Sequence, residues 1–87
     1  MKDEFYKFND SGHGWLQVTR TDLTKLGIEK SISPFSYQND EFVYLEEDSD
    51  MGTFLKAYQT VVGAEPTIFD TYVAAESEIR KYESYTI

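Results

Sequence analysis

The one histidine of the chain lies in a glycine-flanked segment beside the one tryptophan. Gly12-His13-Gly14-Trp15 brings an imidazole close to an indole, a combination suited to ligand binding at a turn. A hydrolase would need a nucleophile and an orienting group held beside that imidazole, and nothing in the sequence selects either. In the structural alternative the glycines shape a hairpin turn, Trp15 enters the core and His13 points to solvent. His13 and Trp15 are therefore a candidate ligand or turn site, and no catalytic residue is predicted.

Metal and cofactor chemistry has little support in the sequence. The absence of cysteine excludes a disulfide scaffold, a thiolate zinc site and a cysteine nucleophile. The segment 48–52 resembles the start of a calcium loop, but an EF-hand requires Asp or Asn where Gly52 stands and Glu where Gln59 stands. We expect no metal, no cofactor and no enzymatic activity.

Carboxylates crowd the segment between Lys30 and Lys56, which contains no basic residue. Acids just before a helix interact favourably with its dipole, each contributing about 0.3–1 kcal/mol, and one of them can cap the helix. Those two roles use one or two acids, whereas four stand within residues 46–50. The additional carboxylates repel one another, and they therefore predict a surface for a positively charged partner. The acids of this predicted surface are Asp40, Glu41, Glu46, Glu47, Asp48 and Asp50.

Alternation along a strand through residues 40–48 places Val43 and Leu45 on one face and Phe42 and Tyr44 on the other. If the aliphatic face packs on the core, Phe42 and Tyr44 are aromatic anchors among the carboxylates, and Tyr37 is a third candidate. Alternate strand residues are about 6.6–6.8 Å apart, close to the spacing of phosphates along a nucleic-acid strand. In the alternative both faces are covered and the aromatic residues belong to the core.

Local patterns predict an α+β fold with a single antiparallel sheet. Turn residues after Asn9 indicate a hairpin over residues 4–18, and Asn39-Asp40 indicates a second hairpin over 35–45. A further strand is predicted over 67–73, while the tail 74–87 fits either a helix, through Ala75, Ile79 and Tyr82, or an extended segment.

Two helices complete the predicted order β-β-α-β-β-α-β. The first follows a capping box formed by Thr19 and Asp22 and ends at Gly27. The second starts at Ser49 or Asp50, carries apolar residues at helical spacing and ends at Gly63. We expect residues 1–87 to form one α+β domain with both helices packed on the sheet.

Composition supports a folded, acidic, intracellular protein. Hydrophobic residues make up 40% of the 87 residues and aromatic residues 16%, enough to bury a core. The net charge is −8, and all of it lies in residues 40–87, which disfavours direct binding to nucleic acid. No apolar run is long enough for a membrane span and the N-terminus does not begin a signal peptide, so a cytoplasmic location is expected.

Several segments together resemble small proteins of bacteriophages and other mobile elements. The resemblance rests on residues 12–16, 26–28, 32–33, 35–38 and 43–48, with Tyr44-Leu45-Glu46-Glu47-Asp48 as its most specific stretch, and on the tail 79–82. These relatives have no established activity, so no functional residue is transferred. The resemblance implies a phage setting, in which small acidic proteins are often inhibitors of host defence enzymes such as CRISPR effectors and restriction systems.

Three hypotheses follow. The first is a non-enzymatic inhibitor that binds a basic, nucleic-acid-handling host protein in the host cytoplasm through the acidic surface. The second is a structural or regulatory homo-oligomer, such as a homodimer, joined by exposed aromatic residues such as Trp15, Tyr37 and Tyr44. The third is a ligand-binding domain centred on His13 and Trp15.

Overall fold

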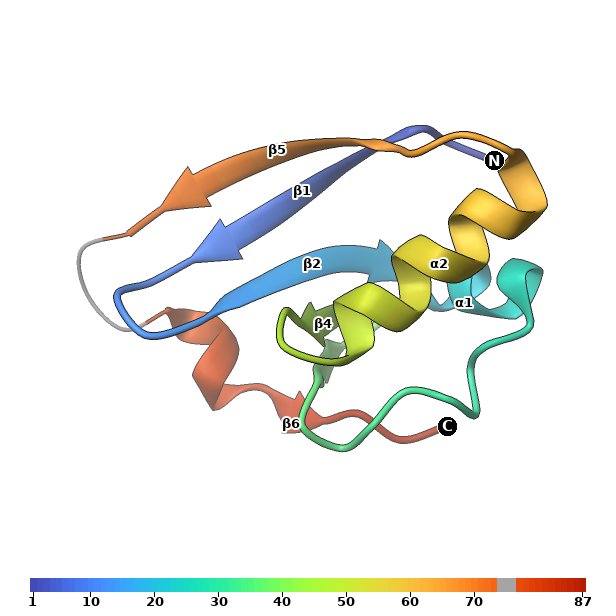
Figure 1. Ribbon diagram of the computed structural model, residues 1–87. Coiled ribbons are helices and arrows are strands. Elements are labelled where there is room, and N and C mark those ends of the chain that lie inside the picture. The colour runs from blue at the N-terminus through green and yellow to red at the C-terminus, as the bar shows by residue number, and fades with distance from the viewer. Residues whose placement is uncertain (74–76) are drawn as a thin grey trace.

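The computed structural model describes residues 1–73 and 77–87 and has the predicted α+β fold (Figure 1). Its elements follow the predicted order β-β-α-β-β-α-β, and a short 3-10 helix and a final strand come after them. The strands are β1 (Glu4–Asn9), β2 (Gly14–Thr19), β3 (Tyr37–Asn39), β4 (Phe42–Glu46), β5 (Thr67–Tyr72) and β6 (Glu83–Ser84). The helices are α1 (Arg20–Leu26), α2 (Asp50–Val62) and the 3-10 helix η1 (Glu78–Lys81).

All six strands form one sheet in the order β5-β1-β2-β4-β3-β6. Both predicted hairpins are present, since β1 pairs with β2 and β3 with β4 in antiparallel register. The expectation of a wholly antiparallel sheet is wrong for one pair, because β1 and β5 run parallel. The chain makes this pair by crossing the sheet through α2 before it returns along β1, a connection that a tight turn cannot provide.

The first helix begins and ends as its sequence predicts. The Asp22 backbone N–H donates to Thr19 Oγ1 at 3.0 Å, and the Thr19 N–H donates to Asp22 Oδ2 at 2.9 Å, which completes the capping box. Gly27 ends the helix in the left-handed conformation with φ of 68°, where a side chain would be strained.

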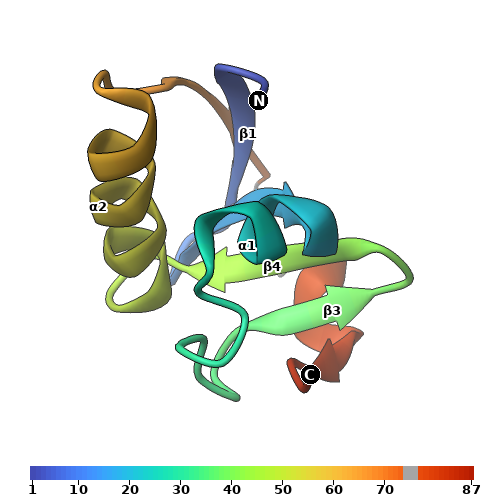
Figure 2. The ribbon, with the colours of Figure 1, turned by 90° about the vertical axis from the view of Figure 1, so that its right-hand side faces the viewer.

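The main core lies between the sheet and its two helices, which cover the same face (Figure 2). Leu16, Val18, Val43 and Leu45 contribute the sheet side of this core and are fully buried. The Phe5 ring meets the Phe54 ring of α2 edge-on, with centroids 5.1 Å apart. The aliphatic face of β4 therefore packs inward, as the alternation predicted.

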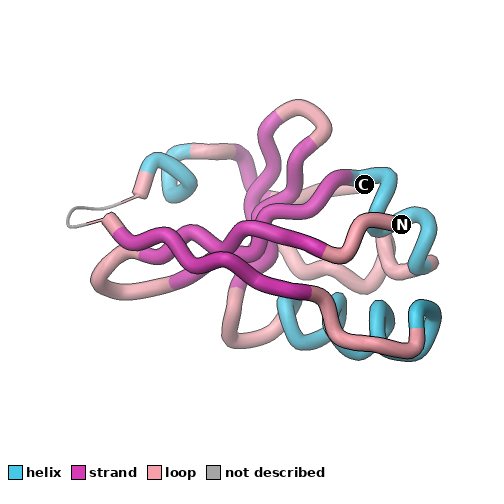
Figure 3. Tube along the Cα trace, turned by 90° about the horizontal axis from the view of Figure 1, so that it is seen from above, coloured by secondary structure: helices cyan, strands magenta, loops and turns pink. Residues whose placement is uncertain are grey.

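The opposite face of the sheet is covered in part by the C-terminal segment. Trp15, Tyr44 and Ile79 form a second buried cluster, against which Phe8, Tyr37 and Tyr82 pack. The ambiguous tail thus contains one 3-10 turn and one short edge strand, which place Ile79 and Tyr82 on the sheet, while Ala75 lies outside the described residues. In Figure 3 the strands, in magenta, run between the 3-10 helix η1 on one side and helix α2 on the other.

Within residues 1–73 and 77–87, none of the helices combines the length and the apolar character that a membrane crossing requires.

Candidate binding pocket

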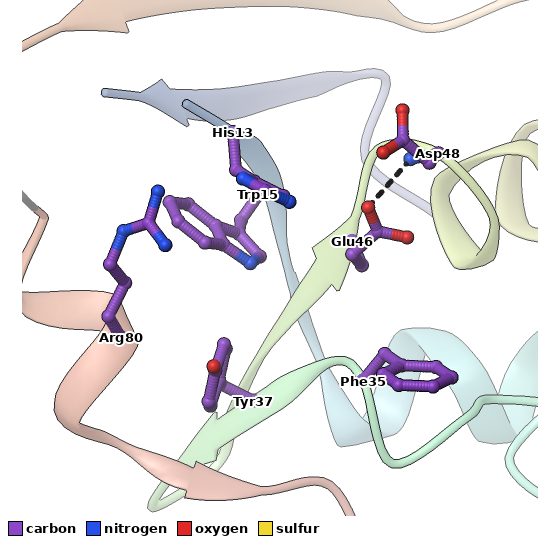
Figure 4. A pocket seen from close by; sticks show the side chains of 7 residues that line it. All are labelled: His13, Trp15, Phe35, Tyr37, Glu46, Asp48 and Arg80. Carbon is purple, nitrogen blue, oxygen red and sulfur yellow. Dashed lines mark hydrogen bonds between the residues drawn. The ribbon is translucent and has the colours of Figure 1, made fainter. Parts of the chain in front are cut away.

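The pairing of β2 with β4 brings the glycine-flanked turn next to the end of the acidic strand. Trp15 lies opposite Glu46 in this ladder, and the Glu47 N–H donates to the Gly14 carbonyl at 3.1 Å. A pocket of about 300 Å³ opens where these two segments meet the C-terminal 3-10 helix (Figure 4). It is lined by His13, Trp15, Phe35, Tyr37, Glu46, Asp48 and Arg80.

Asp10 holds the turn that carries His13. Its Oδ1 accepts the backbone N–H groups of Gly12 and His13, each at 2.9 Å. Arg80 binds the same carboxylate through Nε at 2.6 Å and through a second guanidinium nitrogen at 2.9 Å. The Ser77 N–H adds a contact of 3.0 Å to Oδ2. The Arg80 guanidinium, followed by these backbone donors, holds the pKa of Asp10 far below its usual range.

Three potential ligand atoms converge at one side of the pocket. His13, Glu46 and Asp48 each direct a nitrogen or a carboxylate oxygen to within 4.8 Å of the other two. The Asp48 N–H donates to Glu46 Oε1 at 3.1 Å, which holds the Glu46 carboxylate against the Asp48 backbone. In the described part of the chain neither carboxylate forms an ion pair. The cation of the pocket, Arg80, pairs with Asp10, so the two carboxylates have no ion-pair partner among the described residues.

Aromatic rings form the rest of the wall. Trp15 is 2% exposed, its ring stacks on the His13 imidazole at 6.0 Å, and the Arg80 guanidinium lies 5.3 Å from its centre. The indole N–H is buried and finds no acceptor among the described residues. Such an orphan donor costs about 1–3 kcal/mol, so an oxygen acceptor brought by a ligand would be favourable there.

Phe35 is 75% exposed at the rim of the pocket. Aromatic side chains are common among the residues that contribute most to binding at protein interfaces, so Phe35 is a candidate contact residue. Sequence reasoning did not select Phe35, because it placed this residue at the start of the predicted hairpin over 35–45, where no pattern marks it as exposed. Arg80 was also missed, since Asp10 and Trp15, which it contacts here, are 70 and 65 residues away along the chain.

Asp50 does not lie on the predicted acidic surface. Its side chain is buried, the residue being 2% exposed, and Oδ2 accepts hydrogen bonds from Ser33 N–H at 3.0 Å, Ser33 Oγ at 2.7 Å and Ser36 Oγ at 2.6 Å. Those bonds tie the loop before β3 to the first turn of α2. The carboxylate satisfies an internal network, so Asp50 cannot present its charge to a partner.

The other predicted acids lie in separate places. Glu47 points away from Glu46 and pairs with Lys7 Nζ at 2.6 Å, and the bond to Glu47 raises the pKa of Lys7 despite burial. Asp40 and Glu41 are exposed at the turn between β3 and β4, at the opposite end of β4 from Glu46. The six carboxylates therefore do not form one strip, and Glu46 and Asp48 alone among them line the pocket.

Tyr44 is a core residue whereas Phe42 is partly exposed, so neither alternative for the aromatic residues holds for both of them. Tyr44 belongs to the core, with 7% of its surface exposed, and its hydroxyl accepts the Gln17 amide at 3.1 Å. Burial raises the pKa of Tyr44. Phe42 is 37% exposed, and Tyr37 is half-buried at the wall of the pocket. Of the three aromatic candidates, Tyr37 is thus the one that lines the pocket together with Glu46 and Asp48.

Comparison with family models, with curated proteins and with solved structures finds no match to this chain. The resemblance to small phage proteins therefore stays a prediction.

Proposed function

We propose that this chain is a non-enzymatic interaction protein whose pocket receives a cationic side chain of a basic partner. The observation that carries the proposal is the convergence of the Glu46 and Asp48 carboxylates, without an ion pair in the described chain, in a pocket walled by aromatic rings. Two carboxylates suit a guanidinium, which binds them with several N–H groups at once.

The remaining groups of the pocket fit an incoming segment of protein. Planar guanidinium groups stack on aromatic faces, and Phe35 and Tyr37 offer such faces beside the carboxylates. The orphan indole N–H of Trp15 suits a backbone carbonyl of the same segment.

The class of partner follows from the charge of the whole chain. A net charge of −8 favours association with a basic surface, and proteins that handle nucleic acids carry such surfaces. The phage resemblance narrows the proposed partner to a host defence enzyme of the CRISPR or restriction type. Charge would speed this association, while the buried aromatic contacts would supply most of the affinity.

A matched pair of double variants tests the pocket. Replacing Glu46 by Gln and Asp48 by Asn changes the net charge from −8 to −6, as does replacing Asp40 by Asn and Glu41 by Gln at the distant hairpin turn. Each variant is used to capture proteins from bacterial lysate at low and high salt, and mass spectrometry identifies what elutes. We expect the pocket variant to lose a salt-labile nucleic-acid-binding protein that the hairpin variant retains. Equal recovery by both variants would contradict the proposal.

A homodimer is the second candidate, and we infer a different surface for it from the one that the sequence predicted. Trp15 and Tyr44 are buried, so the predicted aromatic patch does not exist at those residues. Exposed aromatic residues lie instead at the β5 edge of the sheet, where Tyr6 and Phe69 are 51% and 44% exposed with ring centres 5.7 Å apart. An uncovered edge strand with an aromatic flank favours pairing with a second copy.

A further inference from the structure

We propose that His13, Glu46 and Asp48 bind one divalent transition-metal ion of the Zn²⁺ type. This inference does not rest on the proposed partner, because it concerns the isolated protein. One imidazole nitrogen and two carboxylate oxygens form a mixed donor set, which suits borderline metals such as Zn²⁺ and Co²⁺ better than the all-oxygen cages preferred by Ca²⁺.

The spacing of the donors is close to what an ion needs. Three ligand atoms at about 2.1 Å from a tetrahedral ion lie roughly 3.4 Å from one another. The three donors here already lie within 4.8 Å of one another, so small rotations of side chains at the surface bring them together. His13 and Asp48 are exposed, which means that binding requires little rearrangement of the core.

The protein scaffold holds these donors in place. The Asp10 carboxylate fixes the backbone of the His13 turn, and Arg80 in turn fixes Asp10. Glu46 and Asp48 are joined by their own hydrogen bond at the end of β4, which pairs directly with β2. The pairing of β2 with β4 therefore sets the separation of the two segments that carry the ligands, as a preformed metal site requires.

Electrostatics and the surroundings favour an ion at this point. Glu46 and Asp48 repel one another, and in the described chain neither has a cation as an ion-pair partner. The orphan indole N–H of Trp15 is an independent sign of a ligand, because it suits an oxygen bound within the pocket, such as that of a water or carboxylate completing the coordination.

Two single-copy residues make the test direct. His13 is the one histidine and Trp15 the one tryptophan, so the ring protons of His13 and the indole fluorescence each report on this site alone. Protein without a histidine tag is titrated with Zn²⁺ by calorimetry and NMR, and with Co²⁺ by fluorescence. We expect one equivalent of Zn²⁺ to shift the His13 ring resonances and Co²⁺ to quench Trp15.

Variants distinguish Zn²⁺ binding at this site from the general attraction of cations to an acidic protein. His13→Ala and Glu46→Gln should each weaken Zn²⁺ binding roughly tenfold or more. Glu47→Gln removes the same charge one residue away, where the side chain faces Lys7, and should leave binding unchanged. Circular dichroism checks that each variant is folded.

Several outcomes would overturn the site. They are unshifted His13 resonances at saturating Zn²⁺, equal affinity in His13→Ala and the parent, or equal weakening by Glu47→Gln and Glu46→Gln. Failure of the partner proposal would appear differently, as lysate capture that is insensitive to the pocket double variant while Zn²⁺ binding persists.

Discussion

Asp10 is the residue on which the geometry of the pocket depends most. Its carboxylate is 1% exposed and joins the β1–β2 turn to η1 through Arg80. Asparagine would keep the shape of the side chain but lose the charge and one of the two acceptor oxygens. The same bond explains why Arg80 lies against Trp15, because the guanidinium is already directed to this end of the sheet.

We predict that Asp10→Asn destabilises the protein at neutral pH and that this difference shrinks in acid. The pKa of Asp10 is lower in the folded state than in the unfolded chain, where it is about 3.9. Its contribution to stability is therefore complete above that value and is lost as the pH falls toward the folded-state pKa. Urea unfolding of parent and variant from neutral to acidic pH measures the difference. A gap that stays constant down to the most acidic folded sample would contradict the prediction, and Asp40→Asn is the exposed control.

Elements formed by neighbouring residues were predictable, whereas contacts between distant residues were not. The capping box, the two hairpins and α2 depend on residue types within a few positions of one another, and the sequence pattern identified them. The parallel β1–β5 pair joins residues about 60 apart, and no local pattern encodes such a register. The burial of Asp50 likewise depends on two serines that an independent loop brings to it.

In the candidate site, too, the individual residues were predictable but the contacts between them were not. His13 and Trp15 stood out because of their types and their glycine neighbours, and Glu46 and Asp48 because of local charge density. Their meeting depends on the β2–β4 ladder, which links residues about 30 apart in the sequence. Sequence spacing therefore could not indicate a metal-ligand motif, and the expectation of no metal reflected that.

Helix α2 is attached to the sheet mainly by two aromatic rings. Phe54 is fully buried between Phe5 and Tyr58, with ring centres 5.1 and 6.0 Å away. We predict that Phe54→Ala lowers the free energy of unfolding by about 3–5 kcal/mol, because it leaves a cavity among rings that cannot close around it. Chemical denaturation measures the loss. The exposed Gln59→Ala on the same helix should change stability by less than about 0.5 kcal/mol, and a similar loss in both variants would show that the helix itself, not this contact, had been weakened.

At the scale of the whole molecule, the net charge disfavours association of two copies, whereas the exposed apolar surface favours it. A second copy meeting the first along β5 would unite aromatic side chains but bring together two chains that each carry −8. The Thr67 and Val73 N–H groups bond to β1, so alternation turns the backbone groups of Ile68, Asp70 and Tyr72 to the open edge. An antiparallel register centred on Phe69 would place Asp70 opposite Ile68 of the second copy and avoid facing two carboxylates.

We predict that any dimer strengthens as salt is added, since salt screens the repulsion between copies. Partner capture through the acidic pocket should weaken under the same change. Sedimentation at several protein and salt concentrations measures the dimer. Phe69→Lys should abolish it and the equally charged change Phe35→Lys should not, whereas a parent that stays monomeric at every concentration would eliminate this candidate.

The parallel β1–β5 pair also has a consequence for biosynthesis. Strand β1 is translated before β5, yet it is an interior strand whose second neighbour is β5, residues 67–72. Until those residues have been translated, the edge of β1 that pairs with β5 stays unpaired, and this strand carries Phe5 and Tyr6. Such an unpaired strand edge is prone to associate with other nascent chains on the same polysome. Efficient production of this protein therefore depends on how quickly translation passes from β1 to β5.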